Sequence, residues 1–425
     1  MPSSPSPTMP KSLWHDPDFR RLWIGQTASQ LGAQAVMVTL PLIAVLALDA
    51  SAGELGLLRA VEQAPVLLFS LLAGAWVDRR RSRDVLVGTD FGRALALTAI
   101  PVAFAFGLLG MPVLLVVAFT VGVLGVFFDV AYHASLVRLV DRDRLTLGNS
   151  ALEGSRSAAQ VAGPALGGTL VSLFSAPVAA ASAAVFFVWS FVAVRRIQRV
   201  EVVARESGPV EPVWRRIGAG LRFVVGNGVL RAVGLASAAY QFSFAAMMTV
   251  YLLFLPRELG LPGSAVGVAL AAPGPGAILG SVLAARLPGR FGYGVVMVSA
   301  AALADVVLLA LPGLDGSGVV TVALLVAVNF VFGACGQLVN VTVMAVRQAI
   351  TPVAVQGRVV ATINFAGMGM MPFGSLLGGF LADAWGLRTG LLLAVLGMTL
   401  SPLSMALSPL RRLGRRLPEP CDGPR

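Results

Sequence analysis

Long apolar runs fill most of the chain, and polar or charged residues interrupt them at intervals. A helix of about 20 residues crosses a hydrocarbon core of about 30 Å, and the runs reach that length. Reading the runs between charges and helix breakers predicts about twelve membrane-spanning helices and an all-α membrane protein. The predicted helices begin near Arg21, Glu54, Val85, Pro112, Leu145, Ala176, Val229, Gly263, Gly292, Val319, Gly357 and Leu387.

The longest polar interruption falls between the sixth and seventh runs and divides the chain into two six-helix bundles. It extends from Arg195 to Arg222 and contains Pro209 and Pro212. We therefore expect a cytoplasmic tail at 1–18, a bundle at 19–195, a central cytoplasmic loop at 196–228, a second bundle at 229–410 and a cytoplasmic tail at 411–425. Because Met1 to Pro10 contain no apolar stretch, we expect no cleavable signal peptide.

Composition excludes an ordinary soluble protein. Hydrophobic residues make up 56% of the 425 residues and charged residues 12%, against about 25% charged residues in soluble domains. The net charge of +11 does not indicate nucleic-acid binding, because the basic residues form short clusters between apolar runs. We expect no nucleic-acid partner and a monomer in the lipid bilayer of the plasma membrane.

Basic residues mark the orientation. Short loops rich in arginine and lysine stay on the cytoplasmic side. Of the 32 basic residues, 26 fall in the two tails or in every second loop, and the other loops contain only Arg257 and Arg388. Both termini are therefore predicted to be cytoplasmic.

The two halves repeat one another. Arg138 and Arg347 are separated by 209 positions, Pro164 and Pro372 by 208, and Gly167-Gly168 and Gly378-Gly379 by 211, close to half of the chain. Parallel halves of this kind are one architecture of secondary transporters, with the substrate bound between them near the midplane. Chance matching of common helix-packing residues is the alternative.

The loop GAWVDRRRSR, between the second and third runs, carries a family resemblance. Its residues Gly74, Asp78, Arg79 and Arg83 resemble the signature G-x-x-x-D-R-x-G-R-R of the major facilitator superfamily. This resemblance implies a two-bundle transporter in which Asp78 latches onto the start of the eleventh helix, near Gly357 and Arg358. A solvated cytoplasmic turn is the alternative.

A second motif, AGPALGG in the fifth run, resembles the antiporter signature of drug exporters. Gly163, Pro164, Gly167 and Gly168 match it, and Ala159 stands where the first glycine is usual. Proline and glycine permit a bent, close helix contact, so the motif is either a pivot for rocking bundles or ordinary small-residue packing.

Three further stretches resemble the branch that contains the enterobactin exporter and macrolide efflux proteins. They are DFRRLWIG from Asp18 to Gly25, FDVAY from Phe128 to Tyr132, and the stretch from Gly357 to Gly379. The resemblance implies proton-driven export of drugs or natural products, of the antibiotic or siderophore class. Drug and proton antiporters usually carry an arginine in the fourth helix, and Val113 to Val137 contains none.

Ionisable residues at membrane depth are costly and mark functional candidates. Arg59 and Glu62 lie three positions apart in the second run, on one helix face where they can pair. Glu62 and Asp129 are candidates to carry protons, with His133 as a relay. Structural pairing of Glu62 with Arg59 is the alternative, and Asp305 has no assigned role.

Other polar residues within the runs complete the set of candidates. Three glutamines at helical spacing, Gln26, Gln30 and Gln34, are expected to line a cavity for a polar ligand. Two acid and base pairs, Asp90 with Arg93 and Glu153 with Arg156, are expected as structural charge pairs around the inner gate.

The motifs do not favour an enzyme. The only histidines are His15 and His133, and the sequence contains no Walker, HExxH or suitably placed GxSxG motif. We expect no metal and no cofactor, with a small-molecule substrate and protons as partners. Proton-coupled uptake of a small metabolite is the alternative within transport, and a membrane enzyme or receptor is the alternative outside transport.

Overall fold

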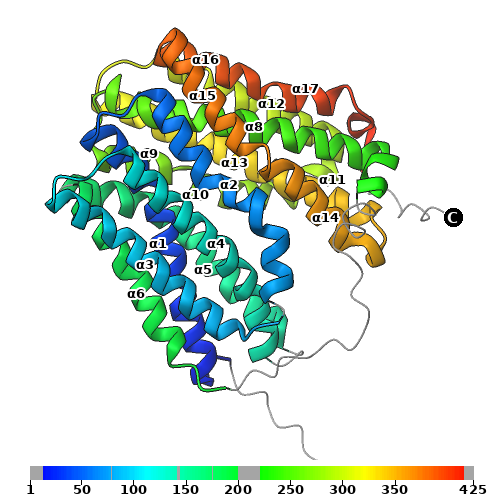
Figure 1. Ribbon diagram of the computed structural model, residues 1–425. Helices are drawn as coiled ribbons and strands as arrows, with labels where there is room; N and C mark the ends of the chain where they lie inside the picture. Colours follow the sequence, from blue (N-terminus) through cyan, green and yellow to red (C-terminus); the bar gives the residue numbers. More distant parts are fainter. Residues whose placement is uncertain (1–12, 78, 141–143, 175, 200–220, 416–425) are drawn as a thin grey trace, which may run out of the picture.

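The computed structural model describes residues 13–77, 79–140, 144–174, 176–199 and 221–415. Every regular element in these ranges is a helix (Figure 1). The helices form two groups, one on each side of residues 200–220, and most helix contacts lie within a group.

The first group follows the short helix η1 (Leu13–His15). Asp16 caps the first long helix, α1 (Pro17–Ala47), by accepting hydrogen bonds from the backbone N–H groups of Asp18 and Phe19 at 2.9 and 3.3 Å. Pro17 fits the first helical position. The helices are α1 (Pro17–Ala47), α2 (Ala52–Val77), α3 (Ser82–Ala105), α4 (Met111–Leu139), α5 (Leu145–Leu173) and α6 (Ala176–Arg195).

The second group contains several interrupted helices. Two of the interruptions lie at Pro273 and Pro372, because proline cannot donate the backbone hydrogen bond that a helix interior needs. The elements are α8 (Gly228–Arg257), α9 (Gly263–Ala271), α10 (Pro273–Ala284), α11 (Leu287–Phe291), α12 (Tyr293–Leu308), η3 (Leu311–Gly313), α13 (Val319–Ile350), α14 (Val353–Met368), α15 (Met371–Trp385), α16 (Leu387–Met398), α17 (Leu400–Ala406) and η4 (Pro409–Arg412).

Length and apolarity qualify these helices as membrane spans. In the described part of the chain, ten helical stretches are long and apolar enough to cross a membrane, with α9 and α10, α14 and α15, and α16 and α17 each contributing to one stretch. The helices α2 and α5, of 26 and 29 residues, also have span length. The predicted all-α membrane fold is confirmed.

The hydrophobic core is shared between the groups at one end of the molecule and divided at the other. At the joined end, where α1 ends and α2 begins, one cluster contains Ile43 and Leu55 of the first group with Phe254 of the second. At the opposite end, which we call the split end, each group has a core of its own, around Phe19 in the first and Met405 in the second. The two groups diverge from the joined end (Figure 1).

Candidate functional site

Glycine contacts bring the two groups together at the joined end. In α5, a Cβ atom on Gly168 would lie only 2.7 Å from the Cα atom of Gly267 in α9. In α15, a Cβ atom on Gly379 would lie 3.1 Å from the Cα atom of Gly56 in α2. The two glycine pairs that repeat 211 positions apart thus form equivalent contacts, each from one group to the other.

The fifth-helix motif also packs within its own group. A Cβ atom on Gly167 would lie 2.6 Å from the carbonyl oxygen of Ala35, and one on Gly163 would collide with the side chain of Gln34. Pro164 is buried, and its carbonyl oxygen would lie 2.9 Å from a Cβ atom on Gly267. The motif therefore fits α5 tightly between α1 and the second group.

Hydrogen bonds and an ion pair reinforce the joined end, and no sequence motif indicates them. The Asp383 carboxylate of α15 accepts hydrogen bonds from the backbone N–H groups of Ala52 and Gly53, at 3.0 and 2.8 Å. Arg257 of α8 pairs with the Asp49 carboxylate at 2.7 Å and donates to the carbonyl oxygen of Ala50 at 2.8 Å. Asp383 therefore caps the start of α2 from the other group.

A polar cluster lies in the half of the first group nearer the split end. Asp129 on α4 interacts with Arg93 on α3, Arg156 on α5, the neighbouring His133 and Gln30 on α1. The Asp129 and His133 side chains are exposed, whereas Gln30 is buried. The cluster therefore combines an accessible carboxylate with an imidazole, an amide and a guanidinium, which suits proton exchange and polar ligands.

The other two glutamines of the predicted stripe differ in exposure. Gln26 is 1% exposed, and neither atom of its amide has a hydrogen-bond partner among the described residues. It lies near Tyr132 of α4. Gln34 is partly exposed at the contact with Gly163.

Arg59 and Glu62 pair on α2, with 2.9 Å between Nη1 and Oε2. The Arg59 side chain is 3% exposed and that of Glu62 is 18% exposed. The adjacent Gln63 accepts a hydrogen bond from Ser375 of α15 at 3.3 Å, so this part of α2 lies beside the second group.

The predicted gate pairs occupy two different environments. Asp90 and Arg93 pair at 2.8 Å and are almost fully buried. Ser29 of α1 donates to Asp90 at 3.0 Å, Ser190 of α6 also donates to it, and the Arg93 guanidinium lies 4.3 Å from the centre of the Phe128 ring. All these partners belong to the first group, so this pair lies inside one group rather than at a gate between two.

The second predicted gate pair is exposed. Arg156 Nη1 lies 3.8 Å from Glu153 Oε1 on α5, and the two side chains are 39% and 57% exposed. At that distance and exposure the pair adds little stability.

Most of the signature loop is described, but Asp78 lies outside the described residues. Gly74 faces open space, since a Cβ atom added to it would meet no described atom within 4 Å. Arg79 is exposed, and Arg83 donates to the carbonyl oxygen of Arg195 at 2.6 Å. The latch to the start of the eleventh helix stays a prediction.

Comparison with known proteins agrees with this architecture. Residues 10–420 match the transmembrane secretion effector family, within the major facilitator superfamily. The chain belongs to this family. The predicted superfamily is therefore confirmed, and this family member is a multi-pass membrane transporter.

Named relatives of this transporter are efflux pumps. It is 30% identical over 356 residues to the multidrug efflux pump Tap of Mycolicibacterium fortuitum, and the match covers 79% of this chain and 82% of that protein. It is 28% identical over 367 residues to the pump of the same name from Mycobacterium bovis, and that match covers 81% of this chain and 82% of the pump.

Solved structures share its fold. A bacterial homologue of the iron transporter ferroportin in an inward-facing state superposes with a TM-score of 0.73 at 16% identity, covering 92% of this chain and 98% of that one. The nucleoside transporter NupG, as its D323A mutant, gives a TM-score of 0.73 at 10% identity, covering 91% and 98%. At these identities the likeness concerns the fold alone.

Proposed function

We propose that this transporter exports drugs or natural products, of the antibiotic or siderophore class, from the cell in exchange for protons. The observation that carries this proposal is the alignment with multidrug efflux pumps over about four-fifths of both chains. The transporter acts as a monomer in the plasma membrane, with both termini in the cytoplasm. Its substrate is a small molecule, which it moves across the membrane without changing it chemically.

Alternating access follows from the two ends of the molecule. With cytoplasmic termini the joined end faces outward, because α1 starts on the cytoplasmic side and ends at the joined end. The divided core at the split end supports an inward-open state. Rocking the groups about the glycine contacts of α5 with α9 and of α15 with α2 would close the split end and open the joined end.

Asp129 is the proposed proton carrier, with His133 as relay and Gln30 and Arg156 as its polar surroundings. An exposed carboxylate that lies among a guanidinium, an amide and an imidazole can exchange a proton when the groups rearrange around it. Arg59 already neutralises Glu62 in this state, so Glu62 can carry a proton only when that pair separates.

Cellular export tests the proposed function. The protein is expressed in an efflux-deficient bacterium, and resistance and accumulation are measured over lipophilic antibiotics and siderophores, with and without a protonophore. We expect resistance and lowered accumulation for at least one compound, both lost with the protonophore. Uptake in place of extrusion would favour the metabolite symporter, and no change for any compound would reject transport of these classes.

The coupling role of Asp129 is tested with proteoliposomes. Asp129→Asn should abolish drug accumulation driven by a pH gradient while drug exchange between the two sides continues, because exchange needs no net proton movement. Glu153→Gln is the matched control, since Glu153 is an exposed acid of the same group. Full gradient-driven accumulation in Asp129→Asn would remove Asp129 from the coupling path.

A further inference from the structure

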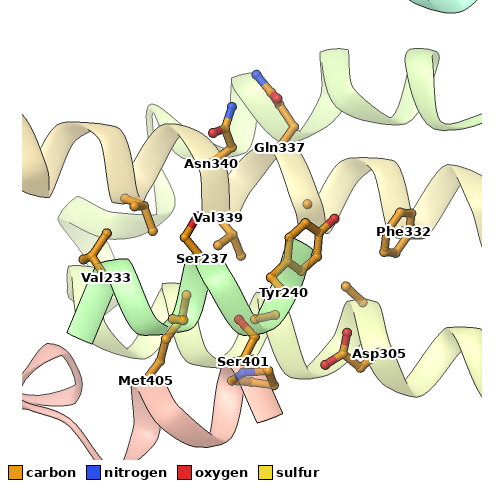
Figure 2. Close-up of a pocket in the computed structure, with 16 residues that line it drawn as sticks. Val233, Ser237, Tyr240, Asp305, Phe332, Gln337, Val339, Asn340, Ser401 and Met405 are labelled. Carbon is orange, nitrogen blue, oxygen red and sulfur yellow. The ribbon is translucent and has the colours of Figure 1, made fainter. Parts of the chain in front are cut away.

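A cavity of about 330 Å³ lies inside the second group, away from the polar cluster around Asp129. Helices α8, α12, α13 and α17 enclose it, and they contribute Tyr240, Asp305, Phe332 and Ser401 respectively (Figure 2). Ligand pockets commonly measure about 300–1,000 Å³ and combine apolar walls with a few polar groups. This cavity is therefore large enough for a small organic molecule or for part of a larger one.

Asp305 supplies a buried carboxyl group with an oxygen atom that is unpaired in the described part of the chain. The residue is 3% exposed, and Oδ2 has no hydrogen-bond partner among the described residues. None of the residues that line the cavity is basic. A buried carboxylate without a cation beside it is unfavourable, so a cation that enters the cavity would stabilise the charged form of Asp305.

Aromatic rings form the wall beside this carboxyl group. The Tyr240 and Phe244 rings stack with 5.6 Å between centroids, and Phe244 stacks in turn on Phe332 at 6.1 Å. Tyr240, Asp305 and Ser401 all line the cavity, and Figure 2 shows their side chains on three different helices. Ring faces attract cations, and flat apolar walls accept aromatic or aliphatic bodies.

Three other acids within the helices already have partners. Glu62 pairs with Arg59, and Asp90 pairs with Arg93. Asp129 has Arg156 and Gln30 as neighbours. Asp305 differs from them because the residues that line its cavity offer apolar contacts and neutral polar groups but no positive charge.

We propose that this cavity binds a monovalent organic cation, an ammonium or guanidinium joined to an apolar or aromatic body. The cationic group pairs with the Asp305 carboxylate, and the body packs against Tyr240 and Phe332. A divalent metal ion is a poor occupant, because calcium and magnesium need about six oxygen ligands and Asp305 is the only carboxylate among the lining residues. As a description of transported substrates, the assignment rests on the proposed export function.

Binding to the purified full-length protein tests this site without transport. Calorimetry compares benzyltrimethylammonium with the uncharged N-benzylpropanamide. We expect the cation to bind at least tenfold more tightly than the amide to the natural protein. Asp305→Asn should remove that preference, and Asp305→Glu should retain most of it because it keeps the charge.

Three outcomes would overturn the proposal: no binding of the cation, no preference for it over the amide, or an unchanged preference in folded Asp305→Asn. If Asp305→Asn fails to fold, the natural protein is treated with dicyclohexylcarbodiimide, which modifies buried carboxyl groups. Mass spectrometry then measures labelling at Asp305, which benzyltrimethylammonium should reduce at least tenfold and the amide should not. Unprotected labelling would contradict the site.

Failure of the export function is separately visible. Export of an uncharged antibiotic by the natural protein does not depend on binding of an organic cation, so cells that express the natural protein test export on its own. If the natural protein exports no compound, the proposed function is rejected. The binding measurements on the purified protein then still decide whether the cavity binds a cation.

Discussion

Removing the Asp383 carboxylate should shift the transporter away from the state in which the joined end is closed. Asp383 accepts hydrogen bonds from the N–H groups of Ala52 and Gly53, across the boundary between the groups. Replacing an acceptor at a helix N-terminus by alanine costs about 0.5–2 kcal/mol. Because Asp383 accepts two such hydrogen bonds, we take about 1–2 kcal/mol, which is about a 5- to 30-fold change in the ratio of the two states.

The folding of α2 should survive this change. Ser51 and Glu54 form a capping box of their own, with Ser51 N–H donating to Glu54 at 2.8 Å and Glu54 N–H donating to the Ser51 hydroxyl at 3.1 Å. Asp383→Ala therefore weakens the contact between the groups and does not destabilise the helix itself. Asp383→Ala should retain the melting temperature of the natural protein within a few degrees.

Distances between spin labels measure the shift. Labels at Leu108 and Val319, which are 70% and 86% exposed, report the separation of the two groups near the joined end. The cysteines Cys335 and Cys421 are first replaced by alanine so that only the introduced sites react. Asp383→Ala should enlarge the fraction of long distances about 5- to 30-fold when that fraction is small.

Asp315→Ala is the matched control. Asp315 is an exposed acid at the same end, and it pairs with Arg388 inside the second group. Its removal should leave the distances between the groups unchanged. If Asp383→Ala gives the same distance distribution as Asp315→Ala, the cap from α15 to α2 does not stabilise the closed joined end.

Two further predictions concern packing. Gly168→Leu should weaken closure of the joined end, because even a Cβ atom would lie 2.7 Å from Gly267. Drug transport should fall at least tenfold, whereas Gly88→Leu, on α3 with open space around it, should retain transport. Equal transport by both variants would contradict the pivot. Arg93→Leu should lower the free energy of unfolding by about 3–5 kcal/mol, because it leaves Asp90 buried without its cation. Adding Asp90→Asn should restore part of this free energy, as measured by chemical unfolding. Equal stability of the single and double variants would show that the charge of Asp90 is not the cause.

The sequence predicts the fold because burial in lipid imposes a simple pattern. Apolar runs of span length, separated by arginine-rich loops, suffice to predict an all-α membrane protein. The repeated glycine pairs also mark the two places where the groups meet, since only glycine allows such close helix contact. Their partners Gly267 and Gly56 have no comparable signal, because glycine is common along the whole chain.

Contacts between distant segments are what the sequence leaves undetermined. The spacing of Asp90 and Arg93 predicts that they pair, but not that Ser29 and Ser190 donate to the acid from two other helices. Asp383 stands at the end of an apolar run and resembles any terminal acid. Its bonds join positions 331 residues apart, which no local pattern can indicate.

Drug transport by the purified protein in proteoliposomes tests the central claim most directly. The vesicle lumen is made acidic, and the uptake of a compound that cells export is measured. Only transporter molecules whose split end faces the outside of the vesicle contribute to this uptake. Proton-driven export predicts accumulation in the acidic lumen, with protons leaving as the drug enters, and complete loss of accumulation with a protonophore. Drug movement that ignores the pH gradient, or that runs in the same direction as the protons, would contradict the account.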